Sequence, residues 1–558
     1  MKRNIILSAI TGAALLLLTA SCSNDENNEQ KEPTQTVQFS FTNEDFGEDE
    51  TPSRATSAAE AKPQTIDLGD CEAEITVENE PAVKKTRGAQ TPATGHYTIR
   101  AYQGGTLKGE MSGTFSGGTF THDAGSQKSF RLPHGTYDFI AFNDDVTVSG
   151  NDLTVARDKA ETARMGTSSV NITGSADVYV PFTMKHVGCR LRTQFVCQKD
   201  IPNNITTTLE PTAVNVIPVS VAYSPATQTY TATNGAMAAT TNNSSASTEE
   251  KYTASKYGKY YAYTSTADYH YFLPTTEGSK LKLTGISAGT VFWKSIPTFN
   301  VPKLNATLQM QAGKSYCVKI KLKPNYTYLM SDGTTGFFKD TTFGGGGKTP
   351  IAIVVSKDKQ LALALKLANN GRQCSWTTNG NSSSQLNTNM VTTFTDCFAM
   401  ENGYEETWEA SSTTAIISGE KVKAKRADFP AFKACADYDP GVTVTGTNVS
   451  KWYLPAFGEW KYLFTELGFG DITQVTNWGR YRCYGNLPSI ALQQVNATDF
   501  EINYRHWTSS ECMGFYGFPV AGQVEMYGNL TYENASAAWF FMDKIYINIA
   551  NVRPFVKY

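Results

Sequence analysis

The sequence predicts a mainly β fold, in which two β-sandwich domains are followed by a mixed α+β domain. Tyr and Phe are abundant, with 28 and 29 copies, and such side chains favour strands. Between residue 97 and about residue 325, short strand-like runs alternate with Gly-rich turns, which is typical of sandwiches. After the tetraglycine at 344–347, helix-like and strand-like runs are mixed, which indicates a different kind of domain.

The first residues predict export. Lys2 and Arg3 precede an apolar run at 5–18, and small residues then lead to a cysteine. The run is too short to cross a bilayer, so residues 1–21 are expected to be a removed signal peptide. The site resembles a bacterial lipobox, which implies that Cys22 is lipidated, for example with palmitate. The alternative is an ordinary signal cut close to the same position.

Residues 22–94 are expected to form a tether. The segment is polar, acidic and rich in proline, yet Val37, Phe39 and Phe41 alternate like a strand. The acidic residues just after Cys22 also resemble the signal that exports Bacteroides-type lipoproteins to the outer face of the outer membrane. The segment is therefore predicted to be a surface tether with one strand that pairs elsewhere.

The charge of the chain limits its possible partners, and its cysteine count limits its possible disulfides. The formal net charge of the 558 residues is -3, and no long basic block occurs, so no nucleic acid partner is expected. Nine cysteines lie beyond Cys22, and an odd count leaves at least one unpaired in a monomer. Cys189 and Cys197 are expected on one strand, too far apart for a disulfide.

The residue composition and pattern of the remaining chain change along its length and indicate domain boundaries. We expect one sandwich at 95–182, a second at 183–327, and a surface loop at 237–250 without an apolar period. A Gly-rich linker is expected at 328–348, followed by the last domain at 349–558.

Within the last domain, both kinds of element are predicted. Residues 351–355 are a compact apolar run typical of a buried strand, and 361–367 is a strongly helix-forming stretch with an ambiguous period. Residues 457–467 carry apolar side chains at helical spacing. Strand-like runs return at 538–541 and 546–549.

Two segments carry a first resemblance. Residues 132–143 (LPHGTYDFIAFN) and 182–191 (FTMKHVGCRL) resemble a strand-turn-strand signature and a later strand of the fimbrillin family. The resemblance covers roughly residues 22–325. It implies that the two sandwiches are transthyretin-like fimbrillin domains.

Three later motifs carry a second resemblance. They are 452–460 (WYLPAFGEW), 506–511 (HWTSSE) and the closing 552–554 (VRP). Their order and spacing are similar to the major-paralogous and C-type-lectin-like modules at the C-terminus of some fimbrial tip proteins. Tyr453 stands where that pattern usually has Arg. The resemblance implies that residues 349–558 form a C-type-lectin-like adhesive domain.

The aromatic motifs have a structural and a functional interpretation. Trp452 and Trp460, on either side of a Leu-Pro turn, and Trp507 supply large apolar area, which favours a place in the core. The alternative is that these rings contact a ligand by stacking on a sugar. The aromatic, Gly-rich segments 481–486 and 513–532 are the candidate loops of a contact surface.

The sequence does not predict an enzyme. Residues 342–349 imitate the end of a phosphate-binding loop, but Thr342 stands where glycine is required. Residues 285–289 match a nucleophile-elbow pattern, yet a strand-like run follows where a helix is needed. No His-Glu-x-x-His or Cys-x-x-Cys motif occurs, and neither does the Glu-Pro-Asn triplet of calcium-dependent lectins. No catalytic residue, cofactor or metal is therefore expected.

The fimbrillin resemblance implies a mechanism of assembly. In that family an arginine-specific protease removes an N-terminal strand, and another subunit then donates a strand to the open groove. Arg87, in KKTRG, and Arg54 are the candidate processing sites, in that order. Family stalk subunits donate a C-terminal strand, whereas here that end continues into a further domain. This difference favours a tip position.

The sequence thus predicts a minor or tip subunit of surface fimbriae that is exported as a lipoprotein, anchored in the outer membrane before processing and incorporated into the fimbrium afterwards. Its expected partners are other fimbrial subunits and a glycan or protein receptor. The alternative is a permanently lipidated glycan-binding protein of a polysaccharide-uptake system. A hydrolase using the last domain is a third, weaker interpretation.

Overall fold

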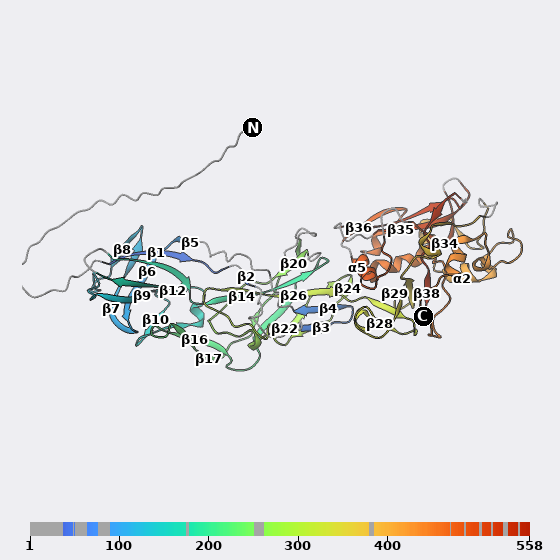
Figure 1. Ribbon diagram of the computed structural model, residues 1–558. Coiled ribbons are helices and arrows are strands. Elements are labelled where there is room, and N and C mark those ends of the chain that lie inside the picture. Colours follow the sequence, from blue (N-terminus) through green and yellow to red (C-terminus); the bar gives the residue numbers. More distant parts are fainter. Residues whose placement is uncertain are drawn as a thin grey trace, which may run out of the picture.

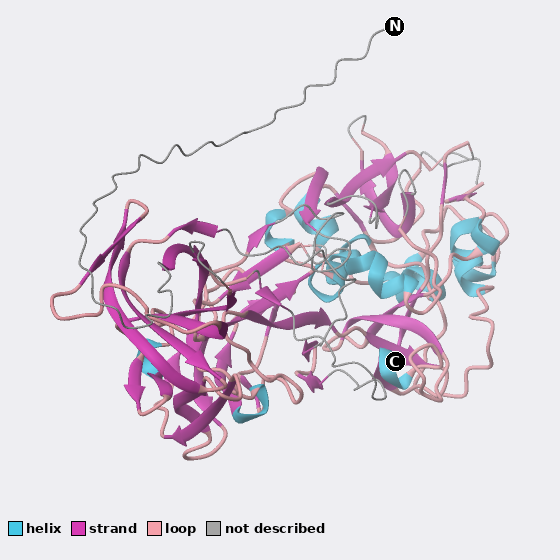
Figure 2. Cartoon of the chain, turned by 60° about the vertical axis from the view of Figure 1, so that its left-hand side comes forward, coloured by secondary structure: helices cyan, strands magenta, loops and turns pink. Residues whose placement is uncertain are grey.

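Figure 1 shows a computed structural model of the chain as an elongated row of three parts. The described residues are 37–47, 49–50, 64–75, 90–173, 178–249, 262–378, 384–468, 470–484, 487–500, 505–514, 517–527, 534–544 and 547–558. Strands predominate, and most helices gather in the C-terminal part, as Figure 2 shows. The expectation of a mainly β chain is confirmed.

The first part is built on an eight-stranded sheet with the order β5-β1-β13-β12-β9-β6-β7-β8. Its strands are β1 (Val37–Glu44), β5 (Gln90–Pro92), β6 (Gly95–Gln103), β7 (Thr106–Ser116), β8 (Thr119–His122), β9 (Gly135–Asn143), β12 (Arg164–Ile172) and β13 (Val178–His186). Only Arg164 and Met165 join β12 to β13, so the sheet is divided into two halves there. Phe182 of one half shares a core with Tyr97 and Phe139 of the other.

A further sheet covers the other face of β9. Phe139 belongs to the first core, whereas its neighbours Ile140 and Phe142 belong to a second one. The covering sheet has the order β10-β11-β16-β17. Its strands are β10 (Thr147–Ser149), β11 (Asp152–Ala156), β16 (Ile217–Ser224) and β17 (Thr229–Gly235). The hairpin β16–β17 was expected in the second sandwich, but Val221 and Tyr223 pack into the core around Ile140. The structure therefore differs from the expected domain of 183–327.

The second part is a sandwich of two sheets, β19-β20-β14-β26-β4-β3 and β18-β15-β22-β25, with β2 and β21 beside the first. The strands are β2 (Asp49–Glu50), β3 (Gln64–Asp67), β4 (Cys71–Ile75), β14 (Cys189–Cys197), β15 (Thr206–Pro211), β18 (Thr240–Thr241), β19 (Thr248–Glu249), β20 (Tyr263–Thr266), β21 (His270–Phe272), β22 (Leu281–Ser287), β25 (Phe299–Val301) and β26 (Ser315–Pro324). Cys189 and Cys197 lie at opposite ends of β14, as predicted.

Two predictions made from the sequence concern segments of this sandwich. The segment 237–250 was expected to be a surface loop, but it contains β18 and β19, and Asn242 is buried, with its side-chain amide donating a hydrogen bond to the Thr193 hydroxyl. After 285–289 the chain forms the short hairpin β23 (Thr290–Val291) and β24 (Lys294–Ser295), so no helix follows that turn. The first expectation is wrong in part, and the second is confirmed.

The third part combines two five-stranded sheets, β28-β27-β29-β30-β38 and β32-β34-β35-β36-β33, with the small pair β31-β37. Its strands are β27 (Thr327–Met330), β28 (Thr335–Phe337), β29 (Pro350–Ser356), β30 (Leu361–Ala364), β31 (Cys374–Ser375), β32 (Met390–Val391), β33 (Gly479–Tyr484), β34 (Arg505–Met513), β35 (Pro519–Tyr527), β36 (Asn534–Met542), β37 (Ile549–Ala550) and β38 (Phe555–Lys557). Its helices are α1 (Phe394–Phe398), α2 (Gly403–Trp408), α3 (Pro430–Ala436), η8 (Phe457–Lys461), α4 (Tyr462–Leu467) and α5 (Leu487–Gln493).

Most of the elements predicted here are present. The run 351–355 lies in β29, the helical run 457–467 forms η8 and α4, and 538–541 lies in β36. The helix-forming stretch 361–367 instead begins with the strand β30. All four side chains of β30 are buried, two of them in each of two cores, so packing on both faces overrides helix propensity.

The expected linker 328–348 is folded. β27 is an inner strand of the C-terminal sheet, and Tyr328 Oη donates a hydrogen bond to Ala491 O at 2.5 Å. Thr341 forms a bridge with Lys348, and a Cβ on Gly344 or Gly346 would collide with a neighbouring carbonyl oxygen. The glycines therefore permit a tight turn, and the linker expectation is wrong at this point.

Among the described residues, no helix is both long and apolar enough to cross a membrane. The described part of the chain also contains no group of three or more His, Cys, Asp or Glu side chains arranged to hold a metal ion.

Candidate functional site

The structure separates the predicted site residues into two groups. Cys22, Arg54 and Arg87 lie outside the described residues, so lipidation and processing stay predictions. Trp452 is 8% exposed, and Trp460 and Trp507 are 0% exposed. A buried ring offers no face to a sugar, so the ligand-contact expectation for these tryptophans is corrected in favour of the core interpretation.

The motif around Trp507 builds a buried polar centre. The Glu511 carboxylate accepts hydrogen bonds from the backbone N–H groups of Leu386 at 2.9 Å and Asn387 at 2.6 Å, and it pairs with the Lys544 ammonium. Both charged side chains are fully buried. The Cys397–Cys512 disulfide fastens α1 to β34 next to this centre. The motif therefore stabilises the fold by joining segments that are distant in the sequence.

The motif around Trp460 contains a second buried carboxyl group. Glu459 accepts hydrogen bonds from Ala456 N at 2.6 Å and from Tyr453 Oη at 2.9 Å. Burial raises the pKa of Glu459 to about 8. No substrate-sized opening adjoins this group among the described cavities. Tyr453, where the resembled pattern has Arg, thus serves as a partner of a core carboxyl.

The N-terminal segment, which we define as residues 37–75, contributes strands to two different parts of the molecule. β1 pairs with β13 in parallel over seven residue pairs, and β5 pairs with its other edge. The chain then reaches the second sandwich, where β2 and β4 pair with β26 and β3 pairs with β4. The next described strand after β4 is β5, which belongs to the first part and lies beside β1 (Figure 1).

β1 inserts two aromatic rings into the first core. The Phe41 ring is 4.8 Å from the Tyr97 ring and 5.2 Å from the Phe182 ring, between centroids. Phe39 packs against Phe139 and Phe182 at 6.4 and 6.0 Å. Because alternate strand residues face one side, this spacing directs both rings inward. Loss of β1 would uncover a row of apolar and aromatic side chains on β13 and β9.

The hairpin β3–β4 closes the second sandwich. Cys71, Ala73 and Ile75 of β4 face its core and are buried. The hairpin also reaches the third part, because Asp67 pairs with Lys339 at 2.6 Å and Asp70 pairs with Lys357 at 2.6 Å. The N-terminal segment therefore touches all three parts of the molecule.

Between the two sandwiches, residues 44–46 of the N-terminal segment pass over a surface of basic and aromatic side chains, and we call this place the crossing. Arg164 donates to Glu44 O at 3.0 Å and to Asp45 Oδ1 at 3.2 Å. The Phe46 ring lies flat on the His186 ring, with centroids 3.8 Å apart. The guanidinium of Arg190 lies 5.0 Å from the centre of the same phenyl ring.

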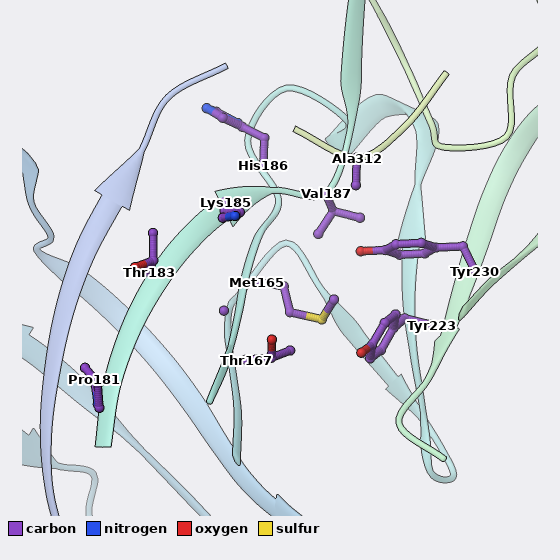
Figure 3. Close-up of a pocket in the computed structure, with 11 residues that line it drawn as sticks. Met165, Thr167, Pro181, Thr183, Lys185, His186, Val187, Tyr223, Tyr230 and Ala312 are labelled. Atoms are coloured by element: carbon purple, nitrogen blue, oxygen red, sulfur yellow. The ribbon is translucent and has the colours of Figure 1, made fainter. Parts of the chain in front are cut away.

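A pocket of about 460 Å³ opens beside this crossing, between β12–β13 and β16–β17. In Figure 3 the hydroxyl groups of Tyr223 and Tyr230 point into it, and the Thr167 side chain lies opposite them. Burial raises the pKa of both tyrosines, so they remain neutral hydrogen-bonding groups. No carboxylate is among the described residues that line the pocket.

Sequence reasoning found β1 through its alternating aromatic residues but missed the crossing and the hairpin β3–β4. The crossing has a sequence signal, because Phe46 stands inside the acidic run 44–50 (EDFGEDE). Its cationic counterpart is spread over β12, β13 and β14 and carries no local pattern.

Solved structures with a distant similarity to this chain are known. No protein-family model matches the sequence, and neither does any of the curated proteins. A Bacteroides uniformis protein named for cell adhesion aligns with 14% identity over 41% of this chain and 91% of its own, at a TM-score of 0.27.

Two further solved structures have related names. A fimbrial protein from Bacteroides ovatus aligns with 11% identity over 95% of this chain and 100% of its own, at a TM-score of 0.23. The fimbrial anchor protein Mfa2 from Porphyromonas gingivalis aligns with 11% identity over 45% of this chain and 78% of its own, at a TM-score of 0.21. At TM-scores this low, none of the three carries an argument about the function of this chain.

Proposed function

We propose that this protein is a surface-exported subunit of fimbriae, at the tip or another minor position, whose N-terminal segment is removed and replaced by a strand from another subunit. One observation carries the proposal. A single continuous segment, 37–75, completes both sandwiches, and Arg87 follows its end by twelve positions and precedes β5 by three. One cut there frees every strand of that segment together.

The two candidate cuts differ in what they would release. A cut after Arg54 frees β1 and β2 only, because β3 and β4 follow it in the sequence. A cut after Arg87 frees all four strands, and β5, whose partner in the sheet is β1, stays on the retained chain. Only the second cut opens one groove along both sandwiches. Arg87 is therefore the processing site in this proposal.

The opened groove needs a new strand for a physical reason. Removing β1 and β4 leaves unpaired backbone groups on β13 and β26 and exposes the aromatic core around Phe182. Both are costly in water unless another chain covers them. An incoming extended segment restores the backbone hydrogen bonds and fills the pockets left by Phe39 and Phe41.

The last strand supports a tip or minor position. β38 pairs with β30 inside the C-terminal sheet, and Phe555 and Val556 are fully buried. A strand so held is not available for donation. In this proposal the third part instead serves as the adhesive module, and the lipid on Cys22 holds the precursor in the outer membrane until the cut.

An experiment with an arginine-specific protease tests the proposal. The lipidated chain is treated with protease, mixed with a fimbrillin stalk subunit and separated on a gel without boiling. We expect loss of the palmitate label and one complex with the stalk subunit in the native chain, and neither in Arg87→Ala. The exposed Arg131 provides a matched control, because Arg131→Ala should behave like the native chain.

Two outcomes would overturn the proposal. One is a ladder of this protein alone, which would make it a stalk subunit. The other is a chain that stays uncut and lipidated on cells with assembled fimbriae.

A further inference from the structure

We propose that the crossing between the two sandwiches selects the incoming strand, and that it accepts a strand carrying an acidic residue followed directly by an aromatic one. The inference rests on the proposed function, since it names the chemistry of the partner that replaces the N-terminal segment. It starts from the crossing clamp, which we define as Arg164, His186 and Arg190.

The clamp is directed at the N-terminal segment. Arg164 is 18% exposed at its side chain, and its guanidinium bonds Glu44 O, Asp45 Oδ1 and His186 Nε2. His186 Nδ1–H donates to Glu161 O at 2.8 Å, which leaves Nε2 as the acceptor from Arg164. In Figure 3 the His186 ring is directed away from Tyr230 and toward the chain that follows β1.

The clamp recognises an aromatic ring through a stacked imidazole and a nearby guanidinium. Phe46 lies nearly parallel to His186, at an angle of 11° between the rings. The Arg190 guanidinium contacts the Phe46 ring at 5.0 Å and the Tyr269 ring at 3.9 Å, and Tyr271 lies 5.8 Å from Phe46. Cation and ring contacts of this kind favour a planar aromatic side chain.

The clamp also recognises negative charge. Arg164 faces Asp45, and Lys185 lies 3.9 Å from Glu44. Arg164, Lys185 and Arg190 thus converge on the acidic run that contains Phe46. The Glu161 carboxyl group, the nearby acid of the body, is bonded to Tyr271. When the N-terminal segment leaves, Arg164 loses the carboxylate of Asp45 and Lys185 loses that of Glu44, and an anionic strand compensates both cations best.

The register of β1 extends this preference into a pattern. Counted from Phe39, the inward ring of Phe41 is two positions later, the acidic Asp45 six positions later and the aromatic Phe46 seven positions later. A replacing strand that keeps the pairing with β13 must present its side chains at the same intervals. The fitting partner is therefore an extended segment with two alternate aromatic residues, three spacer residues, an acidic residue and an aromatic residue.

Labelled peptides test this pattern on the protease-trimmed protein. The native peptide of residues 37–50 is compared with Phe46→Ala, Asp45→Lys and the matched control Gln38→Lys, whose parent residue is exposed on β1. We expect Phe46→Ala and Asp45→Lys to raise the dissociation constant about tenfold each, and Gln38→Lys about twofold or less. Added salt should raise the dissociation constant of the native peptide. The ratio of the dissociation constants of the Phe46→Ala and native peptides should stay the same.

The outcomes distinguish the two proposals. If the intact chain is not cut at Arg87, or if the trimmed protein binds neither the native peptide nor a stalk subunit, the proposed function falls. If the native peptide binds and the Phe46 and Asp45 variants bind equally well, the clamp is refuted and the proposed function stands.

A second measurement needs no cleavage. In the uncut chain, Phe46→Ala and Asp45→Lys should each accelerate amide hydrogen exchange in β1 about tenfold, whereas Gln38→Lys should not. Unchanged exchange in both variants would overturn the clamp independently of the protease.

Discussion

The N-terminal segment and the C-terminal part are stabilised in opposite ways. β1 is held by rings that enter a core and by partly exposed charges, such as Asp45, whose side chain is 65% exposed. The C-terminal part has apolar cores as well, but it also contains two ion pairs, Glu406–Lys423 and Glu511–Lys544, whose side chains are all fully buried. A disulfide closes the same part.

This difference indicates which region can be replaced by a segment of another chain. Apolar insertion and backbone pairing can be supplied by any strand with suitable side chains, so the contacts of β1 are transferable to another chain. A buried ion pair is different, because removal of one partner leaves an uncompensated charge in the core. In the proposed exchange, the C-terminal part is therefore expected to remain one rigid unit.

The largest effect is expected from breaking the buried centre of the C-terminal part. Glu511→Ala leaves the Lys544 charge and the N–H groups of Leu386 and Asn387 without their acceptor. We expect a loss of about 4 kcal/mol in the free energy of unfolding of that part. Scanning calorimetry should show its transition shifted down while the transition of the first part is unchanged.

The control for that change is an exposed pair in the same part. Glu405 lies 3.6 Å from Lys557, with side chains 47% and 40% exposed. Glu405→Ala should cost less than about 1 kcal/mol, because water screens such pairs. Equal shifts in the two variants would contradict the distinction between buried and exposed charges.

A smaller effect is expected from removing one ring of β1. Phe41→Ala should lower the free energy of unfolding of the first part by about 3 kcal/mol, since it empties a packed site among Tyr97, Phe115 and Phe182. Urea unfolding followed by tyrosine fluorescence measures this loss. Gln38→Ala, at an exposed position of the same strand, is the control. A shift in the C-terminal transition instead would contradict the separation of the two regions.

The smallest effect concerns pH. His96 bonds Asp123 at 2.8 Å and Asp144 at 2.6 Å, and these two carboxylates, Asp123 first, raise the pKa of His96. Its stabilising contribution to the first part is therefore complete below the ordinary pKa of 6.5 and is lost as pH rises through the raised pKa. Because the side chain is 35% exposed, we expect less than about 1 kcal/mol.

Melting temperatures of the first part between about pH 5.5 and pH 8.5 measure this contribution. His96→Gln should flatten the decline, whereas His134→Gln, at an exposed position, should keep it. An unchanged pH profile in His96→Gln would show that the histidine does not supply the dependence.

Local patterns were sufficient for several elements. The alternation of Phe39 and Phe41 predicted β1, and the helical spacing at 457–467 predicted η8 and α4. These predictions are correct because the spacing of apolar residues is set by the geometry of a single element. The core role of Trp460 followed from the size of its ring.

Other features depended on partners remote in the sequence. The stretch 361–367 has helix-forming residues, but β30 forms because β29 and β38 pair with it on both edges. The hairpin β16–β17 joined the first part through β11, and the tetraglycine became a turn through contacts with Phe338 and Asp340. Pairing of this kind is decided by tertiary packing, to which propensity contributes little.

The sequence by itself determined the abundance of strands, the aromatic periodicity of β1 and the acidic run around Phe46, because each is a property of neighbouring residues. Only the tertiary structure decided that this run meets Arg164, Lys185 and Arg190, and that one segment completes two sandwiches. The physical reason is that charge attraction and strand pairing act between groups close in space, and the fold brings these together across more than a hundred residues.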